Sequence, residues 1–192
     1  MEDLPSPRVD AERNRRVLLE VAAGALARDP DASLGEVARL AGLTRATLYR
    51  HFGSREKLVD ALRDDALGSA AEAVAAARVD EGTAVEALRR VTAAITSLGG
   101  RFWPLLLEGA DRDSGFLRRR EEAFAPVVNL IERGQLSEEI RTDVSPQWAV
   151  TALMALLAAA VRQAKGFEDP GIAERVFDTV AFGIQEPRGR KN

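Results

Sequence analysis

The chain has no cysteine and only one histidine, His51, among its 192 residues. Without cysteine there is no disulfide, no thiolate zinc site and no cysteine nucleophile. With a single histidine, a transition-metal site would need carboxylates almost alone, and a hydrolytic triad would have to use His51. The sequence therefore predicts no metal, no cofactor and no catalytic residue, and we expect a protein that is not an enzyme.

Long apolar segments are also missing. The longest uninterrupted apolar run, residues 152–161, has 10 residues, whereas a transmembrane helix needs roughly 20. The first residues are acidic and interrupted by proline, unlike a secretory signal peptide. We therefore expect a soluble, cytoplasmic protein that does not enter a membrane.

Charge is distributed unevenly along the chain, although the formal net charge is only −3. Residues 13–57 contain nine Lys and Arg against five Asp and Glu, so this segment has a net charge of +4 and the rest of the chain −7. A basic segment in an otherwise acidic chain favours contact between that segment and a polyanion. On composition alone, a chance cluster of solvated arginines is the alternative.

Apolar residues recur at helical spacing along the chain, and no segment alternates apolar and polar residues as a strand does. Clusters of glycine and proline mark the helix ends. Residues 1–9 and 187–192 are expected to be disordered tails. On the first helix, one apolar stripe is expected, made of Val17, Leu18, Val21, Ala22, Ala25 and Leu26. The sequence predicts an all-α fold with helices at 10–28, 34–40, 45–51, 55–78, 83–98, 101–108, 113–134, 146–165 and 169–185.

Residues 33–51 show the pattern of two short helices joined by a tight turn. Ser33 and Glu36 have the Ser-x-x-Glu spacing of a capping box at the start of the first helix, and Thr44 is placed to cap the second. Gly42 lies where the chain reverses. Two short helices with such a turn form a helix-turn-helix, whose second helix can lie in the major groove of DNA.

The same segment resembles the N-terminal signature of TetR-family transcriptional regulators. The most specific part is the block Thr-Leu-Tyr-x-His-Phe, at 47–52, followed by Ser-Arg-Glu-x-Leu at 54–58. The resemblance covers about residues 13–62, and the remaining two thirds of the chain match the family only in size, helical content and layout. One departure is Asp29-Pro30, which replaces a glycine that the family often has after its first helix.

The resemblance implies a homodimer whose two recognition helices enter successive major grooves of a palindromic operator, ~34–36 Å apart. It implies a helix-turn-helix DNA-binding domain at 10–56 and a larger helical effector-binding and dimerisation domain at 57–186. The function implied is a ligand-responsive repressor that a small, apolar or aromatic effector releases from DNA. The implied partners are double-stranded DNA, a second copy of the chain and an unidentified small molecule.

Candidate DNA-binding residues lie on the second short helix and at the neighbouring helix starts. Arg45 is best suited to read guanine, because its paired donors match O6 and N7. Hydroxyls at helix N-termini suit phosphate. The resemblance assigns Tyr49 and His51 to the DNA backbone, and places Arg55 where the family usually has lysine. The full set is Ser33, Thr44, Arg45, Thr47, Tyr49, Arg50, His51 and Arg55.

A helix that is apolar on nearly every face spans 148–161, and such a helix has to be buried all round. A partner subunit is one way to cover it and an internal core position is the other. The resemblance favours a four-helix dimer interface made together with 169–185. The interface candidates are Trp148, Thr151, Ala155, Ala158, Ala159, Val176 and Val180.

Bulky apolar residues on the middle helices are candidates for an effector pocket. The resemblance implies a cavity among them, whereas ordinary core packing is the alternative for each one. The candidates are Phe102, Trp103, Leu106, Phe116, Phe124 and Val127. Two other functions stay open at this point: a constitutive DNA-binding regulator without a ligand, and a helical adaptor that binds protein partners.

Overall fold

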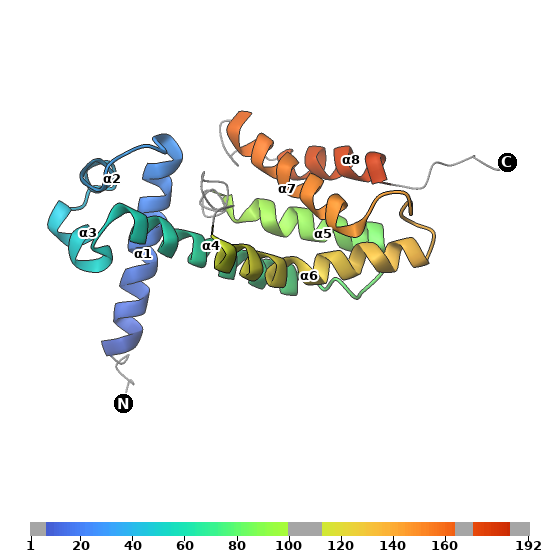
Figure 1. The fold of residues 1–192 in the computed structure, drawn as a ribbon, viewed down its shortest axis with the longest axis horizontal. Helices are drawn as coiled ribbons and strands as arrows, with labels where there is room; N and C mark the ends of the chain where they lie inside the picture. Colours follow the sequence, from blue (N-terminus) through green and yellow to red (C-terminus); the bar gives the residue numbers. More distant parts are fainter. Residues whose placement is uncertain (1–6, 100–112, 164–170, 185–192) are drawn as a thin grey trace.

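A computed structural model of the chain describes residues 7–99, 113–163 and 171–184, and these residues form eight α-helices (Figure 1). The all-α prediction is thereby confirmed for this part of the chain. The predicted helix at 101–108 and the tail at 187–192 lie outside the described residues. The helices are α1 (Pro7–Arg28), α2 (Leu34–Leu40), α3 (Arg45–Phe52), α4 (Arg55–Ala76), α5 (Ala84–Ser97), α6 (Ser114–Leu136), α7 (Pro146–Gln163) and α8 (Ile172–Ile184).

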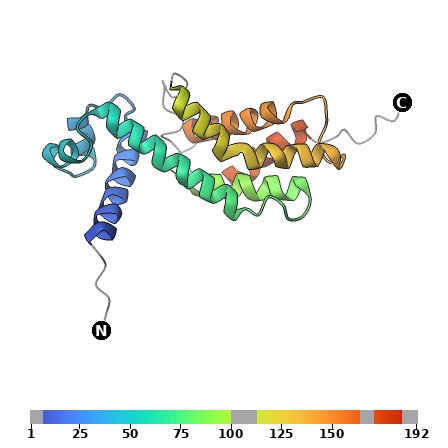
Figure 2. The same ribbon diagram turned by 60° about the horizontal axis from the view of Figure 1, so that its bottom comes forward.

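Two hydrophobic cores lie along the molecule, and α4 contributes to both. The smaller core combines α1, α2 and α3 with the first turns of α4, up to Leu62. The larger core begins on α4 at Ala66 and includes α5, α6, α7 and α8. Figures 1 and 2 show α4 running out of the small N-terminal unit and along the larger one. A single helix, α4, therefore connects the two units, because its buried residues belong to both cores.

Helix α1 differs from its prediction at its start and in its buried face. It begins at Pro7, so residues 7–9 are helical rather than part of a disordered tail. Leu19 and Leu26 face the smaller core, whereas Val17 and Val21 are 51% and 37% exposed. Several neighbouring positions of this helix are apolar, so its sequence allowed more than one stripe, and packing against α2 and α4 selects one of them.

The turn between α4 and α5 is fastened by side chains from neighbouring elements. Arg90 of α5 donates hydrogen bonds to three backbone carbonyls of the chain preceding its helix. Arg133 of α6 donates to the carbonyls of Val79 and Gly82, at 2.8 and 2.9 Å. The carboxylate of Glu139 accepts from the first backbone N–H of α5 at 2.8 Å. This end of the larger unit satisfies its polar backbone groups from within the chain.

Among the described residues, no helix is long and apolar enough to cross a membrane. Pro126 lies inside α6, which continues as a helix on both sides of it.

Candidate nucleic-acid interface

Hydrogen bonds at two helix starts hold α2 and α3 in place. At α2, Ser33 Oγ accepts from the backbone N–H of Glu36 at 3.3 Å, and the Glu36 carboxylate accepts from the backbone N–H of Ser33 at 2.8 Å. At α3, Thr44 Oγ1 accepts from the backbone N–H of Thr47 at 3.1 Å, and the two threonine hydroxyls lie 2.8 Å apart. The predicted capping box at Ser33 and the predicted N-cap at Thr44 are confirmed.

The capping box has an electrostatic consequence. Hydrogen bonds from the side chain and the backbone of Ser33 lower the pKa of Glu36, because they stabilise its carboxylate. The turn that follows α2 depends on Gly42, whose φ of +66° is a conformation that glycine adopts without a Cβ clash. Directly after it, the backbone N–H of Leu43 donates to the carbonyl of Ala38 at 2.8 Å. These local bonds fix the angle at which α3 leaves α2.

Helix α3 has an apolar inner side and a polar outer side. Leu48 and Phe52 are buried in the smaller core. Arg45, Arg50 and His51 are exposed, and Tyr49 is among the exposed large side chains. The outer side therefore presents cationic and hydrogen-bonding groups on a helix narrow enough for the major groove.

Arg45 and Tyr49 contact each other on this outer side. Arg45 Nη2 donates to Tyr49 Oη at 3.2 Å, and the guanidinium carbon lies 5.1 Å from the centre of the tyrosine ring. The two residues are four positions apart, the spacing at which helical side chains meet. The structure thus brings together two of the predicted DNA-binding residues.

Arg55 lies at the start of α4 but reaches back to the loop between α1 and α2. Its Nε donates to the carbonyl of Ala32 at 2.9 Å, and its Nη2 to the carbonyl of Pro30 at 2.5 Å. Two of its five N–H donors are therefore used inside the chain. The sequence did not predict this contact, although it bridges the loop in which Asp29-Pro30 departs from the family pattern. The phosphate contact expected of Arg55 stays a prediction. Nη1 is the guanidinium nitrogen that would make it, because Nε and Nη2 already donate within the chain.

The predicted interface residues divide into outward and inward sets. On α7, Trp148 is 61% exposed, and Thr151 and Ala155 are exposed on the same side of the helix. Ala159 is half-buried and Ala158 is buried. On α8, Val176 and Val180 are buried in the larger core of their own chain, and their contact with a partner subunit stays a prediction. Phe182, at 80% exposure, is the large outward side chain of α8.

The predicted pocket residues are only partly described. Phe116, Phe124 and Val127 of α6 are buried in the larger core. Phe102, Trp103 and Leu106 lie outside the described residues. For the three buried residues, core packing is what the structure shows, and their contact with an effector stays a prediction.

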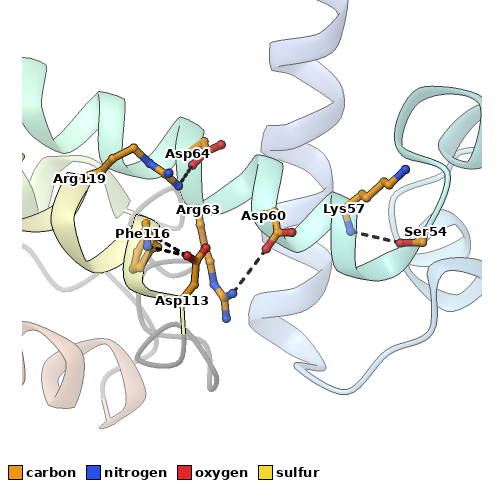
Figure 3. A network of polar contacts seen from close by, with 9 residues as sticks. Ser54, Lys57, Asp60, Arg63, Asp64, Asp113, Phe116 and Arg119 are labelled. Carbon is orange, nitrogen blue, oxygen red and sulfur yellow. Dashed lines mark hydrogen bonds and ion pairs between the residues drawn. The ribbon is translucent and has the colours of Figure 1, made fainter.

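Charged residues occupy α4 where one core ends and the other begins (Figure 3). Arg63 is buried, with Nη1 3.7 Å from Asp60 Oδ1 and its guanidinium carbon 5.9 Å from the ring centre of Phe116 on α6. One turn further along α6, Arg119 Nη2 donates to Asp64 Oδ1 at 2.8 Å. The first turns of α6 therefore contact α4 at the boundary between the two cores.

Comparison with known proteins agrees with this geometry. The family model described as bacterial regulatory proteins, tetR family, matches residues 18–62, which include all eight predicted DNA-binding residues. The HTH-type transcriptional repressor LfrR of Mycolicibacterium smegmatis is 29% identical over 190 residues, covering 94% of this chain and 97% of that protein. The helix-turn-helix segment of this chain is therefore similar to that of tetR-family regulators.

Solved structures of TetR-like regulators share the fold. The TetR-like regulator LfrR from Mycobacterium smegmatis, in complex with proflavine, has a TM-score of 0.75 at 27% identity, covering 92% of this chain and 99% of that chain. The regulator PfmR from Thermus thermophilus has a TM-score of 0.68 at 23% identity over 88% of this chain and 99% of its own, which shows the fold alone. The match at residues 18–62 and the similarity to a transcriptional repressor along the chain both support a DNA-binding transcriptional regulator rather than an enzyme.

Proposed function

We propose that this chain is a cytoplasmic, ligand-responsive repressor of the TetR family that binds a palindromic operator as a homodimer. The N-terminal unit, predicted at 10–56, docks α3 of each subunit in the major groove, and the unit predicted at 57–186 dimerises and binds the effector. The observation that supports this most directly is the outer side of α3, where Arg45, Arg50 and His51 are exposed within a basic segment. Exposed arginines on a capped helix suit a polyanion with a groove.

Roles within the interface follow from the chemistry of each side chain. Arg45 reads a guanine through two parallel N–H donors. The remaining residues contact phosphates or sugar, which fixes the register of the protein on the duplex without reading sequence. Thr47 is also placed to touch a thymine methyl group, and Arg50 can serve either purpose. The residues assigned to the backbone are Ser33, Thr44, Thr47, Tyr49, Arg50, His51 and Arg55.

The decisive experiment is selection of bound duplexes from a random pool, followed by the same selection with Arg45→Ala. We expect the wild type to enrich a palindrome, and Arg45→Ala to lose ~1–3 kcal/mol of binding free energy and to relax one base position in each half-site. Arg118→Ala is the matched control, because Arg118 is an exposed arginine on α6, away from α3. Equal weakening of Arg45→Ala on every sequence would contradict direct base reading.

Dimerisation is proposed through the outward side of α7 and α8, where Trp148 and Phe182 are exposed. Exposed aromatic side chains on adjacent helices are typical of surfaces that a partner covers. We expect light scattering to give about twice 20.8 kDa, and Trp148→Glu to shift the protein toward monomer. Leu136→Glu is the control, because Leu136 at the end of α6 is 89% exposed but lies on neither helix. A monomeric wild type would remove the palindromic model.

Effector control is proposed to act through α4, which is packed into both cores. A ligand shifts an equilibrium only by its differential affinity for the two states, and a change from 1:99 to 99:1 requires ~5.5 kcal/mol. Contacts from Phe116 and Arg119 of α6 onto α4 offer a route from the larger core to the small unit. Displacement of α6 by a ligand would move these contacts, and with them the end of α4 that packs in the small N-terminal unit.

Proflavine is the first probe for this proposal, because LfrR was solved in complex with it. Planar dyes also stack on bases, so binding is measured first without DNA, as a shift in the unfolding temperature of the protein. At 100 times its Kd, a ligand of the native state stabilises by ~2.7 kcal/mol. Failure of every apolar or aromatic compound tested, both to bind and to change operator affinity, would favour the constitutive regulator.

A further inference from the structure

The side chain of Arg45 is held at its charged end by one residue. Tyr49 accepts a hydrogen bond from Arg45 Nη2 at 3.2 Å and also offers its ring, 5.1 Å from the guanidinium carbon. A hydrogen bond and a cation–π contact to the same side chain restrict both the position and the tilt of the guanidinium plane.

The stem of Arg45 lies near the first turn of α2. Gly35 lies there, and a Cβ at this position would be 3.8 Å from Arg45 Cδ and 4.0 Å from Arg45 Nε. The stem therefore passes Gly35 at a distance that would accommodate a methyl group there. Arg45 thus has Gly35 near its stem and is bound to Tyr49 at its guanidinium.

We infer that Tyr49 is a positioning residue for Arg45 and thereby sets base specificity, an inference that rests on the proposed role of α3 in DNA binding. Fixing a free, rotamer-rich side chain on binding costs between about twofold and tenfold in affinity. A guanidinium that is already oriented avoids that cost. One N–H donor is bound to Tyr49 and four remain, which is enough for paired contact with a guanine edge.

This role adds to the contact with the DNA backbone proposed above for Tyr49, and the two roles can be measured separately. A phosphate contact adds the same affinity on every sequence, whereas a positioned Arg45 adds affinity only where its base is correct. Tyr49→Phe removes the hydroxyl and keeps the ring, so the fold of α3 is preserved, which circular dichroism checks. We expect this variant to lower the preference at the base pair identified by Arg45→Ala about two- to tenfold, and to leave the other positions unchanged.

A double-mutant cycle completes the test. In the Arg45→Ala background, Tyr49→Phe should have no further effect on that base preference, because the arginine that it positions is gone. Arg50→Ala is the matched control: Arg50 is an exposed arginine next to Tyr49 in the chain, and its effect should add to that of Tyr49→Phe. The cycle uses the full-length protein and the duplex obtained by selection.

The outcomes separate the inference from the function on which it rests. The positioning role is overturned, and DNA binding stands, if Tyr49→Phe weakens binding equally for all four bases. The same conclusion holds if the effect of Tyr49→Phe on base preference is as large in the Arg45→Ala background as in the wild type. If Arg45→Ala alters no base preference, the reading role of Arg45 falls and the positioning role falls with it. If the folded wild type binds no duplex at low salt, the proposed function itself is overturned.

Discussion

The outer side of α3 and the turn between α4 and α5 both depend on arginine, but they use it in opposite ways. At the turn, Arg90 and Arg133 direct their donors at backbone carbonyls of the same chain. On α3, Arg45 and Arg50 are exposed, and Arg45 donates to a neighbouring side chain while keeping further donors available. An arginine bound to carbonyls stabilises a fold, whereas one that presents its donors outward is ready for a partner.

Arg55 shows why sequence position alone does not separate these two uses. It lies within the basic segment and within the family signature, next to residues expected on DNA. Its side chain nevertheless behaves like the arginines of the α4–α5 turn, because it donates to the carbonyls of Pro30 and Ala32. Three sets of variants test the comparison, in order of decreasing expected effect.

The largest effect is expected for Arg133→Ala. This change removes two charge-assisted hydrogen bonds to the carbonyls of Val79 and Gly82, of which the first is part-buried. We expect the free energy of unfolding in urea to fall by about 2–4 kcal/mol. Affinity for the selected duplex should be unchanged while the protein is folded. Loss of DNA binding without loss of stability would contradict the assignment of Arg133 to the fold.

A smaller and mixed effect is expected for Arg55. Arg55→Ala removes two hydrogen bonds in a more exposed loop and should lower the free energy of unfolding by about 1–2 kcal/mol. If Nη1 also contacts phosphate, the slope of log affinity against log salt should flatten by about one. Arg55→Lys keeps the charge but not the fork, so it should restore the slope and not the stability. An unchanged slope in Arg55→Ala assigns the residue to the fold alone.

The smallest effect concerns the capping boxes, which occur in both regions. Hydrogen bonds from Ser33 lower the pKa of Glu36, and those from the backbone and side chain of Thr83 lower the pKa of Glu86. A folded-state pKa below the unfolded value contributes stability above the unfolded pKa, ~4.3, and loses it as the pH falls through the folded pKa. Stability therefore declines over that acidic window.

Replacement of either glutamate by glutamine should reduce this acid dependence to a similar extent in both regions. Thermal unfolding followed from pH 6 downward measures it, with Glu122→Gln as the control, since Glu122 is an exposed glutamate of α6. Equal effects at Glu36 and Glu86 would show that the two regions use their capping boxes alike and differ in how they use arginine. A clearly larger effect at Glu36 would show that α2 depends on its cap more than α5 does.

The features that sequence analysis found are those with local causes. The caps at Ser33 and Thr44 depend on atoms within three residues, so their spacing is visible in the sequence. The contact from Arg55 joins residues 23 and 25 positions apart, which no pattern reveals. On α8, apolar residues occupy more than one face, so the inward direction of Val176 and Val180 depends on packing against α5 and α7.

Helix α4 is unbroken from Arg55 to Ala76 and spans 22 residues, so it is a lever about 33 Å long. Tilting such a rod by about 5° around one end carries the opposite tip through about 3 Å. In a two-fold assembly both levers would tilt together, and the separation of their tips would change by up to twice that displacement. The DNA helix repeats every ~34 Å, so a shift of this size is enough to move one recognition helix out of register with the other.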